Sequence, residues 1–186
     1  PNSPPSDSSF VPELQSKWNP YPTKWPNGMI LGDLAHSYGM KMTLYMCQTY
    51  EDTSIADWNG RSKNLGALKY RLKEWNIDYY RSDFNLEGPD ATNNYASHEG
   101  FMWVLDQLIN DSELPNFRYE HCSGGGALKD FTSLERMTFM TTEDSGRALA
   151  HRNVAYADSY MINPVQLKVD NSIDWPPLEG TYSDQN

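Results

Sequence analysis

The chain has 186 residues, with 15 Lys and Arg against 25 Asp and Glu, so its formal charge at pH 7 is −10 and its isoelectric point is about 4.7. This acidic balance argues against a nucleic-acid-binding domain, which needs a basic face to neutralise phosphates. Hydrophobic residues make up 38% of the chain, more than a disordered acidic segment contains. We therefore expect a folded domain. No run approaches the roughly 18 to 20 apolar residues that cross a bilayer, so neither nucleic acid nor a membrane is an expected partner.

The two ends of the chain differ in composition from its middle. Residues 1–17 and 171–186 are polar and rich in Pro, Ser or Asp, which predicts loop-like terminal segments. Two cysteines, Cys47 and Cys122, are too few for a disulfide framework or a closed zinc site. No metal site is predicted, and the sequence names neither a compartment nor an oligomeric state.

Helix-like and strand-like segments alternate between these ends. A helical face over residues 29–38 ends at Gly39, a residue type that commonly ends helices. Further helices are predicted near 62–75, 97–110, 127–137 and 146–156, the second with Ser97 and Glu99 at its start. Strands are predicted at 40–46, 77–82, 117–121, 138–142 and 158–162. The repeated order of strand, helix and strand indicates parallel strands with helical crossovers.

Two architectures fit this repeat, an open doubly wound sheet and a closed eight-stranded barrel. After the first predicted strand, residues 47–52 read Cys-Gln-Thr-Tyr-Glu-Asp, without the Gly-rich phosphate loop that an open-sheet oxidoreductase needs. Polar residues follow each predicted strand, where barrel enzymes build their active sites. Five strands do not close a barrel. We therefore predict an α/β fold, an incomplete excerpt of a (β/α)8 TIM barrel with about five to six βα units, over residues 18–170.

Two aspartates follow predicted strands. Asp83 comes after residues 77–82, beside Arg81, and a neighbouring guanidinium favours the ionised carboxylate that a nucleophile requires. Asp144 stands next to Glu143, and repulsion between adjacent carboxylates holds one proton more tightly, as a general acid requires. Two such groups about 5 to 5.5 Å apart cleave glycosides with retention. Spacing alone leaves open that both are solvated loop acids.

A Gly-rich segment follows the third predicted strand. Residues 120–126 read Glu-His-Cys-Ser-Gly-Gly-Gly, and successive glycines let the backbone approach a ligand closely. The Cys122 thiol, Ser123 and exposed backbone N–H groups would then bind sugar hydroxyls. The alternatives are a simple turn and a packed thiol.

Two more side chains near predicted strand ends have alternative roles. Tyr45 would border the cleft or pack in the core, and we expect the core. His121 would either orient Glu120 or serve a structural role.

These motifs resemble those of the α-galactosidase and raffinose synthase family, glycoside hydrolase family 36 of the retaining α-galactosidase clan. Residues 77–85, Ile-Asp-Tyr-Tyr-Arg-Ser-Asp-Phe-Asn, are similar to its nucleophile motif I-D-Y-x-K-W-D-M-N. Residues 122–130, Cys-Ser-Gly-Gly-Gly-Ala-Leu-Lys-Asp, are similar to C-S-G-G-G-x-R-x-D. Residues 143–147, Glu-Asp-Ser-Gly-Arg, fall on the acid/base motif S-D-x-T-D. Weaker likenesses upstream extend the resemblance over most of the chain, from about Trp18 to about Pro164.

The resemblance implies a reaction and a set of site residues. It implies retaining hydrolysis of α-galactosides or related α-linked sugars through a covalent glycosyl-enzyme, with an oligosaccharide or glycoside as substrate and without a cofactor. Asp83 would be the nucleophile and Asp144 the acid/base. The implied substrate-binding residues are Arg81, Asn85, Cys122, Ser123, Gly124 and Gly125.

Several positions depart from the family's motifs. Arg81 and Ser82 stand where the family has lysine and tryptophan, and Leu128 and Arg147 where it has arginine and aspartate. Arginine offers a planar fork where lysine offers a point charge, so the sugar's identity stays open. A transglycosylase of the raffinose-synthase type and a carbohydrate-binding pseudoenzyme are the alternative functions.

Overall fold

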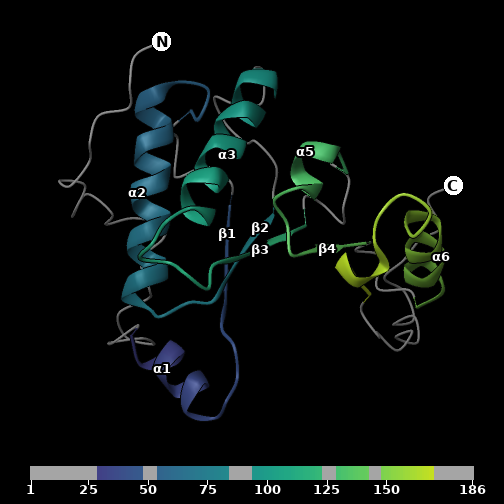
Figure 1. The fold of residues 1–186 in the computed structure, drawn as a ribbon, viewed down its shortest axis with the longest axis horizontal. Coiled ribbons are helices and arrows are strands. Elements are labelled where there is room, and N and C mark those ends of the chain that lie inside the picture. The colour runs from purple at the N-terminus through teal and green to yellow at the C-terminus, as the bar shows by residue number, and fades with distance from the viewer. Residues whose placement is uncertain (1–28, 48–53, 84–93, 123–128, 143–147, 170–186) are drawn as a thin grey trace, which may run out of the picture.

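The computed structural model describes residues 29–47, 54–83, 94–122, 129–142 and 148–169, so the terminal segments 1–17 and 171–186 lie outside the described residues. Five parallel strands form one sheet in the order β1-β2-β3-β4-β5 (Figure 1). The strands are β1 (Thr43–Cys47), β2 (Tyr79–Asp83), β3 (Arg118–His121), β4 (Phe139–Thr141) and β5 (Leu167–Lys168). The helices are α1 (Met29–Ser37), α2 (Trp58–Glu74), α3 (Asn94–Ile109), α5 (Phe131–Leu134) and α6 (Ala148–Asp158), with a 3₁₀ turn, η2 (Pro164–Gln166). Consecutive parallel strands joined by helices are the pattern of a (β/α) barrel, so the predicted fold class is confirmed.

One face of the sheet packs on α2 and α3, which lie side by side in Figure 1. The ring of Phe101 from α3 lies edge-on to Tyr80 and Tyr119, at centroid distances of 6.4 and 6.0 Å. Other buried side chains of this core are Met46, Leu68, Leu72, Val104, Leu105, Leu108 and Met140. Because side chains alternate along a strand, the residues between these core positions point to the opposite face.

A chain of buried hydroxyls lies within this core. The Tyr119 hydroxyl is 2.6 Å from Ser82 Oγ and 2.7 Å from Nδ1 of His121. Burial raises the pKa of Tyr119, so the phenol stays neutral. The contact with Tyr119 places His121 on the helix-covered face. Because side chains alternate along a strand, the preceding residue, Glu120, points to the opposite face. The hypothesis that His121 orients Glu120 is therefore wrong.

Helix boundaries follow from the capping residues. The helix predicted from residue 62 begins earlier, at Trp58, because the Asp57 carboxylate accepts a hydrogen bond from the Gly60 N–H at 2.8 Å. The helix predicted from residue 97 begins at Asn94. Ser97 is therefore buried inside the helix and does not start it.

The strand predicted at 158–162 is wrong. Asp158 is the last residue of α6, and its carbonyl accepts hydrogen bonds from the N–H groups of Met161 and Ile162 at 2.9 and 2.8 Å. The fifth strand follows later, after Asn163 caps η2. Residues 158–162 contain several apolar residues, which is typical of a strand, but they form a tight turn in which Met161 is exposed.

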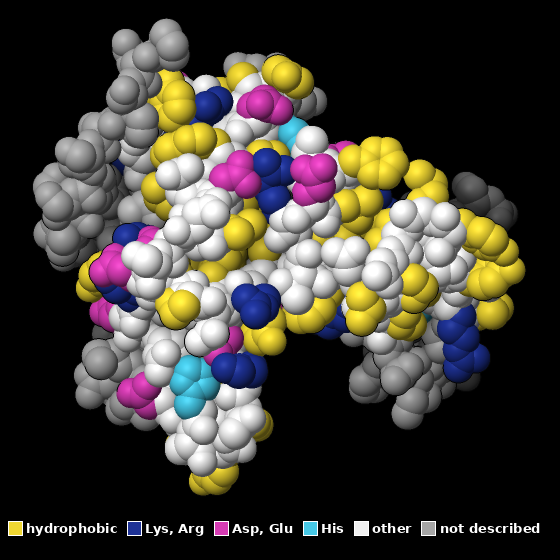
Figure 2. Space-filling model, in the orientation of Figure 1, with side chains coloured by type: hydrophobic (Ala, Val, Ile, Leu, Met, Phe, Trp, Pro, Cys, Tyr) yellow, Lys and Arg dark blue, Asp and Glu magenta, His cyan; other side chains and the backbone are white. Residues whose placement is uncertain are grey.

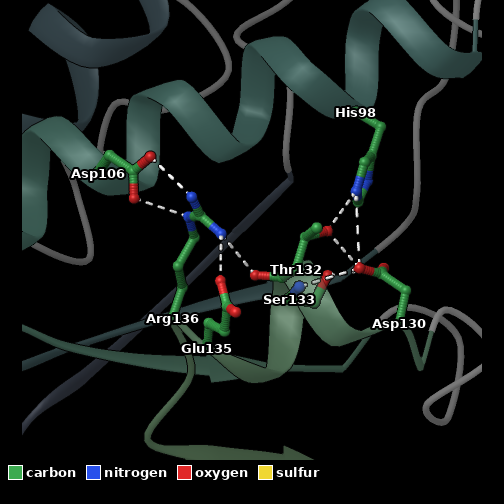
Figure 3. Close-up of polar contacts among 7 residues, drawn as sticks. All are labelled: His98, Asp106, Asp130, Thr132, Ser133, Glu135 and Arg136. Carbon is green, nitrogen blue, oxygen red and sulfur yellow. Dashed lines mark hydrogen bonds and ion pairs between the residues drawn. The ribbon is translucent and has the colours of Figure 1, made fainter.

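Polar side chains hold α5 against α3 (Figure 3). The Arg136 guanidinium donates two hydrogen bonds to the Asp106 carboxylate, from Nε at 2.7 Å to one oxygen and from Nη2 at 2.8 Å to the other. At the start of α5, Asp130 caps the helix. His98 Nε2 lies 2.9 Å from Thr132 Oγ1 and 3.7 Å from the Asp130 carboxylate. These contacts hold α5 in place, and α5 begins five positions after Gly126, the last residue of the Gly-rich segment.

Hydrophobic side chains gather on the exposed surface of α6 and the turn after it (Figure 2). The members, each more than half exposed, are Leu149, Tyr156, Tyr160, Met161 and Val165. Val165 of this apolar surface lies two positions before β5 in sequence, and β5 has β4 as its one neighbour among the described strands.

A buried carboxylate fixes the amino-terminal end of the sheet. Asp78, 8% exposed, accepts hydrogen bonds from Lys41 Nζ at 2.6 Å, His36 Nε2 at 2.7 Å and the Met42 N–H at 3.0 Å. Burial by itself would raise the pKa of Asp78, but these hydrogen bonds hold that pKa below its ordinary value. The turn between α1 and β1, in which Gly39 has a φ of +69°, is thereby tied to β2.

The lowered pKa of Asp78 predicts how stability depends on pH. The folded protein binds the carboxyl proton of Asp78 less tightly than the unfolded chain does. The contribution of Asp78 to the free energy of unfolding is therefore present above about pH 4 and is lost as the pH falls further. We expect Asp78→Asn to lower the free energy of unfolding by about 1 to 3 kcal/mol at pH 7 and by less at pH 3, measured by urea denaturation. Glu135→Gln, at an exposed position, serves as the control and should change it by less than about 0.5 kcal/mol. Equal losses for Asp78→Asn at both pH values would contradict this role.

Candidate active site at the carboxyl end of the sheet

The sheet face opposite the helix-covered core carries a row of polar side chains. Along β2, buried Tyr80 and Ser82 alternate with the partly exposed Arg81 and Asp83. In register, Arg81 lies between Tyr45 of β1 and Glu120 of β3. Parallel strands bring their carboxyl ends to one edge, where barrel enzymes place their catalytic groups.

Glu120 joins four strands at this edge. Its Oε1 accepts hydrogen bonds from Arg81 Nη1 at 3.0 Å, Lys168 Nζ at 2.8 Å and Thr141 Oγ1 at 3.4 Å. Glu120 is 3% exposed, so a buried carboxylate binds two cations, one from β2 and one from β5.

Arg81 connects this carboxylate to the predicted nucleophile. Its Nη2 lies 3.2 Å from the sulfur of Cys122 and 4.0 Å from Oδ2 of Asp83, and its Cζ is 5.9 Å from the centre of the Tyr45 ring. Burial opposes the charge on Arg81, but Cys122, Glu120 and Asp83 together raise its pKa above the ordinary value. A permanent cation at this distance from Asp83 favours the ionised carboxylate.

The structure brings together Asp83, Arg81 and Cys122 among the residues predicted for the site. The other predicted site residues lie outside the described residues, and their positions stay predictions: Asn85, Ser123, Gly124, Gly125 and Asp144. The separation of the two predicted catalytic carboxyl groups is therefore a prediction too.

Several residues of this cluster were not predicted. Tyr45 is 46% exposed on the polar face, so its expected place in the core is wrong. Glu120 was detectable in principle, because it lies two positions before Cys122 and therefore on the same strand face. Lys168 was missed because the fifth strand was predicted at 158–162.

Among the described residues, no group of three or more His, Cys, Asp or Glu side chains is arranged to hold a metal ion. In the same part of the chain, no helix has the length and hydropathy to cross a membrane.

The solved structures with a similar fold include α-galactosidases of glycoside hydrolase family 36. One from Geobacillus stearothermophilus matches with a TM-score of 0.64 at 18% identity, over 81% of this chain and 25% of its own. A variant of another α-galactosidase from that organism, in complex with stachyose, matches with a TM-score of 0.65 at 16% identity, over 83% and 26%. The galactosidase domain of an α-galactosidase-sucrose kinase gives 0.59 at 20% identity, over 71% and 23%. The chain thus has the fold of part of the family 36 barrel and spans about a quarter of those chains' length.

No family model matches the chain. Among curated proteins, a phenylalanine dehydrogenase of Bacillus thermotolerans is 26% identical in an alignment of 141 positions that covers 68% of this chain and 36% of that protein. The chain spans about a third of the length of this relative.

The buried position of Glu120 predicts a large effect of its removal. Glu120→Ala leaves Arg81 and Lys168 without their shared carboxylate, and we expect the free energy of unfolding to fall by about 2 to 4 kcal/mol, measured by urea denaturation. Glu113→Ala is the matched control, because the Glu113 carboxylate also binds two lysines, Lys69 at 2.7 Å and Lys73 at 2.8 Å, but is exposed to solvent. Its loss should be much smaller, since water screens exposed pairs. Equal losses in the two variants would mean that burial of Glu120 has no energetic consequence.

Proposed function

We propose that the full-length protein is a retaining glycoside hydrolase that acts on α-galactosides or related α-linked sugars. The observation that carries the proposal is the position of Asp83 beside Arg81 and Cys122, at the carboxyl edge of a sheet with the fold of family 36 α-galactosidases. Two of the similar structures are α-galactosidase variants in complex with raffinose and stachyose, which supports an oligosaccharide substrate.

The proposed reaction has two steps. The ionised carboxylate of Asp83 attacks the anomeric carbon while the protonated carboxyl group of Asp144 gives its proton to the leaving glycosidic oxygen. A covalent glycosyl-enzyme results. Asp144, now ionised, takes a proton from water, which attacks the anomeric carbon and releases Asp83, so the configuration of the sugar is retained.

The remaining predicted residues would bind the sugar. Arg81 is a fixed cation that stabilises Asp83 both before attack and when it leaves as a carboxylate. The proposed sugar-binding residues are Arg81, Asn85, Cys122, Ser123, Gly124 and Gly125. Residues 18–170 would form part of the catalytic barrel, with residues 1–17 and 171–186 as loop-like terminal segments.

A dinucleotide-dependent oxidoreductase is the rival function from another class, since the curated relative is named a dehydrogenase. Doubly wound dinucleotide-binding sheets place their first strand inside the sheet and reverse the strand order there. In the described sheet, β1 is at one edge and the order runs consecutively to β5. Residues 47–52 also contain no glycine to approach a pyrophosphate. Both observations favour the glycosidase.

The proposal predicts that both aspartates are required. In the full-length protein, Asp83→Asn and Asp144→Asn should each lower kcat on an activated aryl α-galactoside by about 10³-fold or more, because each removes a group that forms or breaks bonds. Thermal unfolding of the variants checks that they fold. Near wild-type turnover in either variant contradicts the assignment.

Azide distinguishes the two roles. With Asp83→Gly, azide takes the place of the nucleophile and gives a glycosyl azide of inverted configuration. With Asp144→Gly, azide attacks the glycosyl-enzyme and gives the retained azide. NMR of the products measures the configuration, and the opposite pattern would exchange the roles of Asp83 and Asp144.

Two further measurements test the alternative functions. Longer oligosaccharides formed from an added acceptor sugar would indicate the transglycosylase, and sugar binding by calorimetry without any turnover would indicate the pseudoenzyme.

A further inference from the structure

Lys168 points onto the same sheet face as Arg81 and Asp83. Its backbone is fixed by the pairing of β5 with β4, and the Lys168 carbonyl accepts hydrogen bonds from the Thr142 N–H at 3.4 Å and Oγ1 at 3.2 Å. The preceding residue, Leu167, packs against the helix-covered core. Alternation along the strand therefore directs Lys168 to the opposite, polar face.

The Lys168 ammonium lies beside the Arg81 guanidinium. Both cations reach the same oxygen, Oε1 of Glu120, at 2.8 and 3.0 Å, and Arg81 is in turn 4.0 Å from the Asp83 carboxylate. A lysine from the fifth strand is thus connected to the proposed nucleophile through Glu120 and Arg81.

Stability does not explain a second cation on Glu120. A buried carboxylate with one well-placed arginine already has its counter-charge, and a further ion pair repays little more than its desolvation and the ordering of a long side chain. An ammonium group has three N–H donors, and among the described residues the Glu120 carboxylate is its one hydrogen-bond acceptor. Because the Lys168 side chain keeps 37% of its surface exposed, the other N–H groups are available to a ligand on this face.

We infer that Lys168 donates hydrogen bonds to hydroxyl groups of the sugar that Asp83 attacks, and that Glu120 is a positioning residue that holds Lys168 and Arg81 side by side. The inference rests on the proposed glycosidase function. Among these four described groups, the two cations Arg81 and Lys168 balance the two carboxylates Asp83 and Glu120. The site therefore suits a neutral sugar with adjacent hydroxyls and not one with an acidic group.

Substitution of Lys168 tests the inference in the full-length protein. Lys168→Met keeps an unbranched side chain one atom shorter and removes its donors, and we expect kcat/KM on an aryl α-galactoside to fall about 10- to 100-fold, with partial recovery in Lys168→Arg. Lys73→Met is the matched control, since Lys73 is ion-paired to Glu113 at 2.8 Å and partly exposed, but lies near the amino-terminal end of the sheet. It should leave kcat/KM unchanged.

A set of monodeoxy aryl α-galactosides gives the readout that a purely structural role would not move. On the substrate that lacks the hydroxyl bound by Lys168, wild type and Lys168→Met should have kcat/KM values within about twofold, while the loss remains on the others. An equal loss on every deoxy substrate, or no loss on any, overturns the inference. If Lys168→Met does not fold, Lys168→Arg on the same substrates decides in the same way. Absence of all hydrolysis in the wild type overturns the proposed glycosidase function instead.

Discussion

The polar face of the sheet depends on one buried carboxylate. Glu120 binds an arginine from β2 and a lysine from β5 through the same oxygen, so strands far apart in sequence meet at one point. Removal of water strengthens each of these attractions, and it also makes the carboxylate costly without them. Glu120 therefore helps to hold the Arg81 guanidinium in the position from which it contacts Cys122 and Asp83.

The two ends of the strands carry different kinds of charge cluster. At the amino-terminal end, Asp78 accepts hydrogen bonds from His36 of α1 and from Lys41 and Met42 after it, and so ties this part of the chain to the start of β2. At the carboxyl end, Arg81 and Lys168 keep exposed surface beside carboxylates. Barrel enzymes separate stability and catalysis in this way between the two ends of their strands, and this division supports the carboxyl end as the functional one.

Local pattern predicted most of the fold, because periodicity and capping residues lie within a few positions of each other. The place of Asp83 at the end of β2 beside Arg81 followed from that pattern. The contact of Arg81 with Glu120 spans 39 positions, and only strand register reveals it. Lys168 lies in a strand of two residues, which is too short for an alternation of apolar and polar side chains to be recognised. The apolar turn that ends at Ile162 was predicted as the strand instead.

The apolar surface along α6 bears on how the protein is handled in the laboratory. Sheet edges pair with other strands, and clustered aromatic side chains associate in water. Among the described residues, β5 forms one edge of the sheet and Tyr156 and Tyr160 expose their rings, so a sample of residues 1–186 has a route to self-association. Light scattering of a purified sample is a sensible first measurement, and catalytic assays on the isolated 186-residue chain need that result before a low rate is attributed to its chemistry.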